Sequence, residues 1–344
     1  MGISNLDYFT LFVSAFVLVG ALTPIMRKIA IKNGVYDSPL QGHKTHKVPV
    51  PYLGGVAIII GTLIVSYGAS LVSNFTKQTF WLASSALLPA LFLGVIGLVD
   101  DIRNLPTWPR FLAQSTAGLF TAIILISTKT VGNPTGNKIL DAIITILWVV
   151  GICNSINFFD NIDGGASGTI AISSLFLFFI AFNYNQFLLA ALSIVITGST
   201  IGFLLWNKSP ARIYMGDAGA LFLGTLMASL TIRLKPQTSE DVLSYSIPIF
   251  LMAIPLLDTS VAVISRIIRG KSPFTGGRDH LSHRLIREEY SKQKAVIILW
   301  VLTFIYGLMA LLLTQVHRFA NLLTTLCLGF WFILYIYFYS RDHE

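Results

Sequence analysis

Charged residues are scarce in this sequence. Asp, Glu, Lys and Arg make up 12% of its 344 residues, whereas soluble domains contain about 25%. Apolar residues reach 54%, and the mean hydropathy is +0.72. So few charges cannot cover a water-exposed surface, which excludes a soluble enzyme and a disordered chain. The composition predicts an all-α, polytopic integral membrane protein.

Cysteine is also scarce, and common nucleotide-binding signatures are missing. Cys153 and Cys327 lie inside apolar runs without a CxxC spacing, which excludes a disulfide scaffold and is typical of small core residues. The sequence contains no Walker A, protein-kinase or Rossmann motif. A nucleotide-bearing substrate would therefore have to be held in another way.

Long apolar runs recur along the whole chain. Each is close to the roughly 20 residues that a helix needs to cross a bilayer. We predict eleven transmembrane helices, at about 6–26, 52–73, 80–99, 110–128, 139–159, 165–183, 186–206, 217–234, 243–265, 294–315 and 319–340. Residues 1–344 are predicted to form a single membrane-embedded domain. Its predicted cytoplasmic loops are 27–50, 100–110, 160–166, 207–216 and 266–293.

The positive charge is distributed unevenly across the predicted membrane. With the N-terminus outside, Lys and Arg divide 18 to 6 in favour of the cytoplasmic side, as the positive-inside rule requires. The first seven residues contain no Lys or Arg and no cleavage site, so we expect the first span to remain as an anchor. The net charge of +8 fits loops that face anionic lipid, and we expect no nucleic-acid partner.

Asp100 and Asp101 form the first polar cluster, where the third span meets the cytoplasm. Adjacent carboxylates at a membrane boundary repel each other and lose solvation unless a cation or proton donor lies nearby. The pair is therefore either a solvated helix end or a group that organises a phosphate or a metal ion.

The second cluster consists of four polar residues at a spacing of three: Asn154, Asn157, Asp160 and Asp163. A helix turns roughly 100° per residue, so the first and last of them would lie on opposite sides of one helix. Unless the run is a chance polar loop, the fifth span must end near Asp160. The glycine pair that follows permits the turn, and irregular backbone at this depth is tolerated where it lines a polar cavity.

Tyr214, Gly216 and Asp217 lie at the cytoplasmic start of the eighth span, in the segment YMGDAG. A carboxylate flanked by glycines can approach a ligand closely, and a helix N-terminus favours a phosphate. Asp is also a common N-cap residue, so a structural role and a functional role both stay open.

The loop at 266–293 is rich in Lys and Arg and contains His280 and His283. Arg suits polyanionic phosphates, although a lipid-surface patch would have the same composition. Asp258 lies about two turns before Arg266 and is either a buried partner of an inner-face cation or a functional group.

A shorter basic stretch at 43–47 contains Lys44 and His46. Its histidines have no convincing set of further zinc ligands. We interpret the stretch as another basic part of the inner face.

Carboxylates, an asparagine, glycines and many cations are thus predicted to gather at one membrane face. Oxygen ligands and a substrate phosphate suit Mg²⁺, and cations neutralise a phosphoryl group in transfer. We predict a Mg²⁺-dependent phosphoryl-transfer site, with Mn²⁺ as the alternative metal. A secondary transporter is the main alternative, but it would place polar groups near the midplane in repeated halves. A lipid-binding scaffold would not need the carboxylates.

Together these motifs resemble the polyprenyl-phosphate N-acetylhexosamine-1-phosphate transferases, glycosyltransferase family 4. The resemblance extends from about residue 37 to 287 and rests on VDD, NxxNxxDxxDG, MGDxG, RGKSPF and HxxHRL. The last two look like the branch that uses UDP-GlcNAc and undecaprenyl phosphate. The resemblance implies transfer of a HexNAc 1-phosphate, release of UMP and initiation of a cell-envelope glycan at the bacterial plasma membrane. UDP-GalNAc, a bacillosamine-type sugar and UDP-MurNAc-pentapeptide are alternative donors, and a homodimer is compatible with the sequence.

The resemblance also implies roles for individual residues. Asp217 and Asn157 would hold Mg²⁺ at the pyrophosphate, and Asp100 would orient or deprotonate the lipid phosphate. The residues implied in catalysis are Asp100, Asp101, Asp160, Asp217, His280 and His283. The residues implied in substrate binding are Asn154, Asp163, Tyr214, Arg266, Arg110, Lys44 and His46. Tyr214 would stack on uracil.

Arg110 stands where many relatives carry Lys. Two departures from the family pattern matter: Ser282 stands where the family has a histidine, and Asn104 stands where a third acid often follows the Asp pair. Neither departure removes a proposed metal ligand, so we expect an active enzyme.

Overall fold

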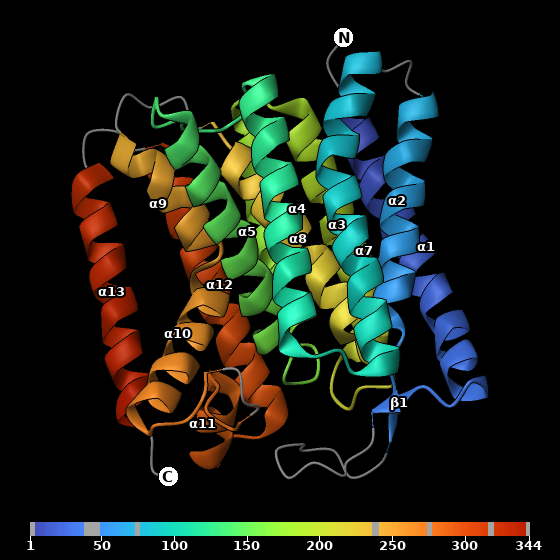
Figure 1. The fold of residues 1–344 in the computed structure, drawn as a ribbon, viewed down its shortest axis with the longest axis vertical. Coiled ribbons are helices and arrows are strands. Elements are labelled where there is room, and N and C mark those ends of the chain that lie inside the picture. The colour runs from blue at the N-terminus through green and yellow to red at the C-terminus, as the bar shows by residue number, and fades with distance from the viewer. Residues whose placement is uncertain are drawn as a thin grey trace.

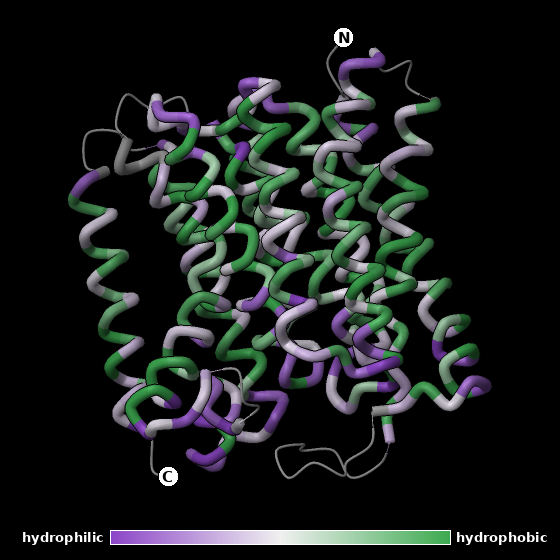
Figure 2. Tube along the Cα trace, in the orientation of Figure 1, coloured by the Kyte–Doolittle hydropathy of each residue, from purple (hydrophilic) through white to green (hydrophobic). Residues whose placement is uncertain are grey.

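Long apolar helices dominate the structure, a computed structural model that describes residues 4–37, 49–72, 76–235, 241–273, 277–315 and 320–341. In a bilayer the backbone groups of a spanning segment must be hydrogen-bonded within the segment itself, which favours helices for these apolar runs. The helices lie side by side in one bundle (Figure 1). Figure 2 shows mainly apolar residues along their lengths and hydrophilic segments gathered at the ends.

The elements follow the chain in a simple order. They are α1 (Asn5–Lys32), β1 (Tyr36–Asp37), β2 (Val50–Pro51), α2 (Gly54–Val72), α3 (Lys77–Arg103), α4 (Thr107–Thr128), α5 (Lys138–Phe159), α6 (Gly165–Asn183), α7 (Phe187–Asn207), α8 (Gly216–Arg233), α9 (Asp241–Leu251), α10 (Ala253–Ile268), α11 (Leu281–Arg287), α12 (Lys292–Leu313) and α13 (Ala320–Ser340). The strands β1 and β2 form a small antiparallel sheet. Polar side chains cap the starts of several helices, namely Ser4, Thr76, Asn137 and Ser291.

The prediction of a polytopic all-α membrane protein is confirmed. Within the described ranges, nine helices are long and apolar enough to cross a membrane, and the bent pair α9–α10 makes a tenth. Helix α8 has 18 residues, but Asp217 and Arg233 lower its mean hydropathy. The start of α1 and the end of α13 lie at opposite ends of the bundle, as an odd number of crossings requires (Figure 1). The count of eleven and the orientation remain predictions.

The ninth predicted span is broken rather than continuous. Helices α9 and α10 meet at an angle of 75°, with Met252 between them. Pro255 explains the break, because it has no N–H for the Leu251 carbonyl and its ring would clash with that group. The first turn of α10 needs no such hydrogen bond, so the proline is accommodated there.

Helix α8 lies in the interior of the bundle, packed against α3 and α5, and most of its side chains are buried. Gly97 of α3 makes the close approach at one end of α8 possible. A Cβ atom at Gly97 would lie 2.3 Å from the backbone oxygen of Asp217. The start of α8 is thus pressed against the end of α3, at the same end of the bundle where α5 stops.

The predicted interruption after the fifth span is confirmed. Helix α5 ends at Phe159, and α6 begins at Gly165. Between them Gly164 adopts φ 75°, a left-handed conformation that favours glycine. This turn brings Asp160 and Asp163 to the same end of the bundle as the start of α8.

Candidate active site

Asp101 of α3 fixes the start of α8. Its Oδ1 accepts a hydrogen bond from the Asp217 N–H at 2.8 Å, and its Oδ2 accepts one from the Ala218 N–H at 3.1 Å. Gly216 adopts φ 71°, and a Cβ there would lie 2.6 Å from the Asp101 carboxylate. Glycine is therefore required for both conformation and space. Asp101 acts as an N-terminal cap supplied by a neighbouring helix, and it sets the position of Asp217.

Four side chains converge beside this cap, and we call them the carboxylate site: Asp100, Arg110, Asn157 and Asp217. Arg110 Nη1 donates to Asp100 Oδ2 at 2.6 Å and to Asp217 Oδ2 at 3.0 Å. Asn157 Nδ2 donates to the other Asp217 oxygen at 2.7 Å. The Asp100 side chain is almost fully buried, whereas Arg110 and Asp217 keep about 30% of their side-chain surface exposed. One guanidinium thus serves two acids, which leaves the site negatively charged and accessible.

The donor atoms of the carboxylate site suit Mg²⁺. Asp217 offers carboxylate oxygens. Asn157 donates to Asp217 through its side-chain nitrogen, so its side-chain oxygen can act as a metal ligand. In the part of the chain that the structure describes, no three His, Cys, Asp or Glu side chains are grouped to hold a metal by themselves. Mg²⁺ commonly takes only one or two protein carboxylates and completes its shell with water and substrate phosphates. Asp217 and Asn157 fit such a partial set.

Asp160 and Asp163 lie in the turn between α5 and α6. Asp163 Oδ2 accepts a hydrogen bond from the Ala211 N–H at 3.1 Å, which ties this turn to the segment before α8. The Asp160 residue is partly exposed, but burial of its carboxyl group and the charges of Asp217 and Asp163 raise its pKa to about 7. Asp160 is therefore only partly ionised near neutral pH.

Tyr214 lies in the segment that leads into α8. Its N–H donates to the Pro51 carbonyl at 2.9 Å, and its carbonyl accepts from the Gly54 N–H at 3.0 Å. The neighbouring Tyr52 hydroxyl donates to the Asp101 carbonyl at 2.7 Å. The segment after β2 thus holds Tyr214 next to the end of α3, close in the fold to the carboxylate site.

Asn154 lies one turn before Asn157 on α5, but its amide is already used. Its Nδ2 donates to Gln114 Oε1 and to the Val150 carbonyl, both at 2.7 Å. Gln114 was missed in the sequence, although its position four residues after Arg110 places both on one face of α4. The structure therefore puts Asn154 at the contact of α4 and α5, behind the carboxylate site.

Charged side chains hold the α10–α11 segment in place, by which we mean the described residues 266–273 and 277–287. The buried His280 ring has Nδ1 2.7 Å from Asp258 Oδ2 and Nε2 3.1 Å from Arg266 Nη2. Arg266 Nε also donates to Asp279 Oδ2 at 2.8 Å. Arg269 Nη1 donates to the other Asp279 oxygen at 3.0 Å. The His280 ring thus lies between a carboxylate on its Nδ1 side and a guanidinium on its Nε2 side.

Three further residues of this segment are buried. Burial, followed by the positive charges around it, lowers the pKa of His283 to about 4, so its ring is neutral at pH 7. Ser282 is 0% exposed and donates to the Asn161 side-chain oxygen. Arg284 donates to the carbonyls of Asp279 and Phe338. Arg284 therefore connects the segment to α13 rather than to a ligand.

Phe158 joins the two regions. The Arg266 guanidinium lies over its ring at 5.8 Å from the centroid, and the His280 ring lies edge-on to it at 6.2 Å. Phe158 follows Asn157 directly, so the α10–α11 segment is packed against the end of α5. Lys44 and His46, the other predicted binding residues, lie outside the described residues.

Comparison with known proteins places these features in context. Residues 83–235, which include the carboxylate site, match the family model of glycosyl transferase family 4. The chain is 33% identical over 311 residues to a probable undecaprenyl-phosphate N-acetylglucosaminyl 1-phosphate transferase of Bacillus subtilis, covering 88% of this chain and 84% of the relative. It is 28% identical over 326 residues to a decaprenyl-phosphate N-acetylglucosaminephosphotransferase of Mycolicibacterium smegmatis, covering 86% and 79%. A phospho-N-acetylmuramoyl-pentapeptide-transferase of Halalkalibacterium halodurans is 28% identical over 324 residues, covering 88% and 94%.

Proposed function

The chain belongs to glycosyl transferase family 4, and we propose that it transfers GlcNAc 1-phosphate from UDP-GlcNAc to undecaprenyl phosphate. It is a multi-pass enzyme of the bacterial plasma membrane. The names of the Bacillus and Mycolicibacterium relatives support a polyprenyl phosphate acceptor and GlcNAc as the sugar. The product would be the lipid-linked sugar that initiates a cell-envelope glycan.

One observation carries the proposal: Arg110 lies between Asp100 and Asp217, with Asn157 on the other side of Asp217. In the proposed reaction an oxygen of the lipid phosphate attacks the sugar-linked phosphorus of the UDP-sugar. The bond from this phosphorus to the oxygen that bridges the two phosphates breaks, and UMP leaves with that oxygen. Both the attacking and the leaving group are anionic, so the site must supply positive charge between them.

Arg110 is the residue that would bind the lipid phosphate. Its guanidinium keeps several N–H groups beyond those donated to Asp100 and Asp217, and Arg is well suited to phosphate. Asp100 would hold Arg110 in place, since the lipid phosphate is already mostly ionised at neutral pH. Asp217 and Asn157 would hold Mg²⁺, which when bound supplies positive charge to the pyrophosphate. Asp101 would keep Asp217 aligned through the start of α8.

The neighbouring residues would contact the rest of the UDP-sugar. Asp160, Asp163 and Tyr214 surround the entry to α8 and would form the nucleoside side of the site. The α10–α11 segment would contribute Arg266 and the neutral His283 ring to the pyrophosphate and the sugar. In this arrangement His280 positions Arg266, because both of its ring nitrogens are already engaged.

The test is UMP release by the purified full chain in micelles. We expect release from UDP-GlcNAc only when undecaprenyl phosphate and Mg²⁺ are both present, with one lipid-linked sugar formed for each UMP. Chelation should stop the reaction, and added Mg²⁺ or Mn²⁺ should restore it. UDP-GalNAc and UDP-MurNAc-pentapeptide, tested in parallel, decide the sugar. UMP release without the lipid would contradict the proposal, and uptake of intact UDP-sugar by proteoliposomes would favour a transporter.

A further inference from the structure

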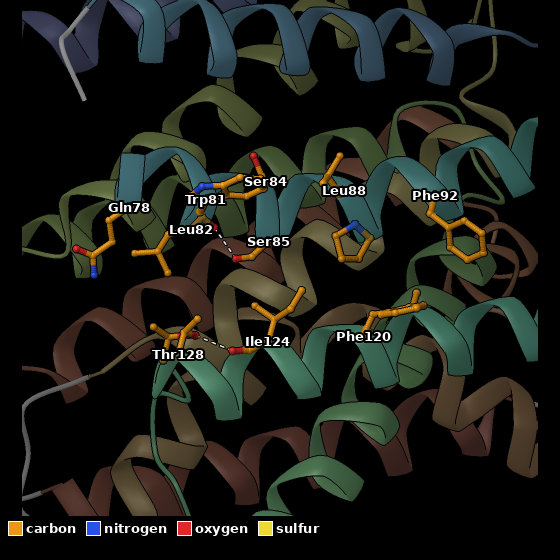
Figure 3. Close-up of a pocket in the computed structure, with 13 residues that line it drawn as sticks. Gln78, Trp81, Leu82, Ser84, Ser85, Leu88, Phe92, Phe120, Ile124 and Thr128 are labelled. Atoms are coloured by element: carbon orange, nitrogen blue, oxygen red, sulfur yellow. Dashed lines mark hydrogen bonds between the residues drawn. The ribbon is translucent and has the colours of Figure 1, made fainter. Parts of the chain in front are cut away.

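An apolar groove lies between α3 and α4, in the half of the bundle away from the carboxylate site. It has a volume of about 790 Å³, within the range of roughly 300–1,000 Å³ that is common for ligand pockets. Figure 3 shows its two sides, with Trp81, Leu88 and Phe92 from α3 opposite Phe120 and Ile124 from α4. Trp81 is 67% and Phe120 57% exposed, so the groove opens toward the lipid.

A second, smaller cavity adjoins the groove at the end of α8. It has a volume of about 250 Å³ and shares Leu82 and Thr130 with the wall of the groove. Its polar lining includes Gln186, Arg233 and Lys235. The Lys235 ammonium group donates to the carbonyl of Lys129, which holds it at this end of the bundle. Together the two cavities form an apolar groove with two cationic side chains, Arg233 and Lys235, at one end.

Arg233 is the unusual residue of this region. It is 9% exposed, and its Nη2 donates to Ser85 Oγ at 2.9 Å. Ser85 can accept this bond because its own proton goes to the Leu82 carbonyl at 2.6 Å. Among the described residues the buried Arg233 Nε has no hydrogen-bond partner, and no acidic side chain pairs with the guanidinium. A buried charge without an ionic partner is costly, so the Arg233 guanidinium favours an anionic ligand.

We propose that these cavities bind one anionic phospholipid. Its phosphate would lie in the smaller cavity against Arg233 and Lys235, and an acyl chain would lie along the groove between α3 and α4. A bilayer lipid is the occupant that matches both parts, since a soluble anion would leave the exposed groove unfilled. Arg binds phosphate oxygens well, and Trp81 at the groove's outer end is typical of the membrane interface. The site lies at the opposite end of α3 and α4 from Asp100 and Arg110, so it is separate from the proposed acceptor site.

The head of the site is tested by charge removal. The full chain is purified in micelles, and bound phosphatidylglycerol and phosphatidylcholine are counted by native mass spectrometry during lipid titration. We expect one tightly held phosphatidylglycerol per chain, and at least tenfold weaker binding of it in Arg233→Gln. Arg233→Lys should restore most of the affinity. Lys138→Gln removes an exposed cation at the same end of the bundle, outside both cavities, and should change nothing.

The groove is tested by filling it. Ile124 lines the groove, and its neighbour Ile123 is 52% exposed and does not. We expect Ile124→Trp to displace the phospholipid, with a loss of affinity of at least tenfold, and the matched Ile123→Trp to bind like the unmodified chain. Asp217→Asn should bind phosphatidylglycerol normally, so this test does not depend on the proposed transferase activity.

Several results would overturn the proposal. Equal binding of phosphatidylglycerol by the unmodified chain and Arg233→Gln would remove the role of the arginine, and equal retention of phosphatidylcholine would remove the preference for charge. Preferential displacement by undecaprenyl phosphate would make this a second acceptor-lipid site. Conversion of a dimer to a monomer by Ile124→Trp would make the groove a contact between two copies. If Arg233→Gln does not fold, Lys235→Gln removes a charge from the same cavity, and unchanged binding in that variant would also overturn the proposal.

Discussion

At the carboxylate site two acids, Asp100 and Asp217, contact one guanidinium. In the α10–α11 segment the ratio is reversed, since Arg266 and Arg269 contact the single carboxylate of Asp279. Burial alone would raise the pKa of Asp279, but the two arginines lower it below its ordinary value, so this acid is ionised. At the carboxylate site the acids outnumber the cation that contacts them, so negative charge is left that a ligand can neutralise. In the α10–α11 segment much of the positive charge is instead neutralised by Asp279 and holds the segment together.

If this contrast is correct, the largest loss of activity follows from changing Asp217. Asp217→Asn keeps the size of the side chain but removes the charge that Arg110 contacts and that Mg²⁺ would need. We expect turnover to fall by about 1,000-fold or more, with the chain still folded. Turnover is measured as UMP release, and folding by the apparent unfolding temperature in micelles. Glu289→Gln, an exposed acid outside the site, is the control; more than a tenth of the activity in Asp217→Asn would refute the assignment.

Arg110 should be the next most sensitive position, and its substitutions separate charge from geometry. Both acids are contacted by the same nitrogen, Nη1, so a lysine ammonium can replace these contacts. We expect Arg110→Lys to keep at least about a third of kcat and Arg110→Met to lose about 100-fold, as removal of a phosphate-binding cation does. Steady-state kinetics against undecaprenyl phosphate provide the measurement. Equal losses in the two variants would mean that the planar fork of arginine is needed.

In the α10–α11 segment, changes should act together and through the fold. His280→Ala and Asp258→Asn each break the same buried contact, so each should lower kcat by about 10-fold and the unfolding temperature by several degrees. The double variant should be little worse than either single one, because both remove the support of Arg266. The measurement is a double-mutant cycle, in which kcat and the unfolding temperature are determined for the unmodified chain, the two single variants and the double variant. Additive losses of kcat with unchanged unfolding temperatures would instead indicate separate direct contacts with substrate.

His283 provides a pH test of the same segment. Its folded pKa of about 4 lies below the unfolded value of 6.5, so the unfolded chain binds a proton more readily between these pH values. The stability that the neutral ring contributes is present above pH 6.5 and is lost as the pH falls toward 4. Asp160, with a raised pKa, has the opposite slope over much of this range, so only the difference between chains is informative. When the pH is lowered from 7 to 4.5, we expect the unfolding temperature of His283→Gln to fall less than that of the unmodified chain. If the unfolding temperatures of the two chains fall equally with pH, the buried neutral ring is contradicted.

Ser282 should have the smallest effect. It makes one described side-chain hydrogen bond, to Asn161, and such a bond contributes about 1 kcal/mol. We expect Ser282→Ala to change kcat/KM by less than about fivefold. Ser282→His should be worse than Ser282→Ala, because the position is fully buried and a larger ring must displace its neighbours. Kinetics of the two variants decide whether the position is supportive or directly involved.

The sequence alone was sufficient for the membrane class, the approximate places of the helices and the break after α5. Hydropathy and the spacing of polar residues are local properties, so they can be read from short stretches of chain. The polar clusters were also recognisable, because carboxylates such as Asp100 at a membrane boundary are costly without a partner. The ninth predicted span, which is broken between α9 and α10, shows the limit of such local reading. The effect of Pro255 on its helix depends on whether the neighbouring turn can bend.

Only the tertiary structure decided which partner each polar group has. Arg110 and Asp217 are 107 residues apart in the chain, and Asp101 and the N–H of Asp217 are 116 apart. Such pairs form because helices distant in sequence pack side by side, and no local pattern encodes that contact. The same reason explains why the Asn154 amide contacts Gln114 and why the His280 ring contacts Arg266. A hydrogen bond in a low-dielectric interior is made by whichever group the packing brings within reach.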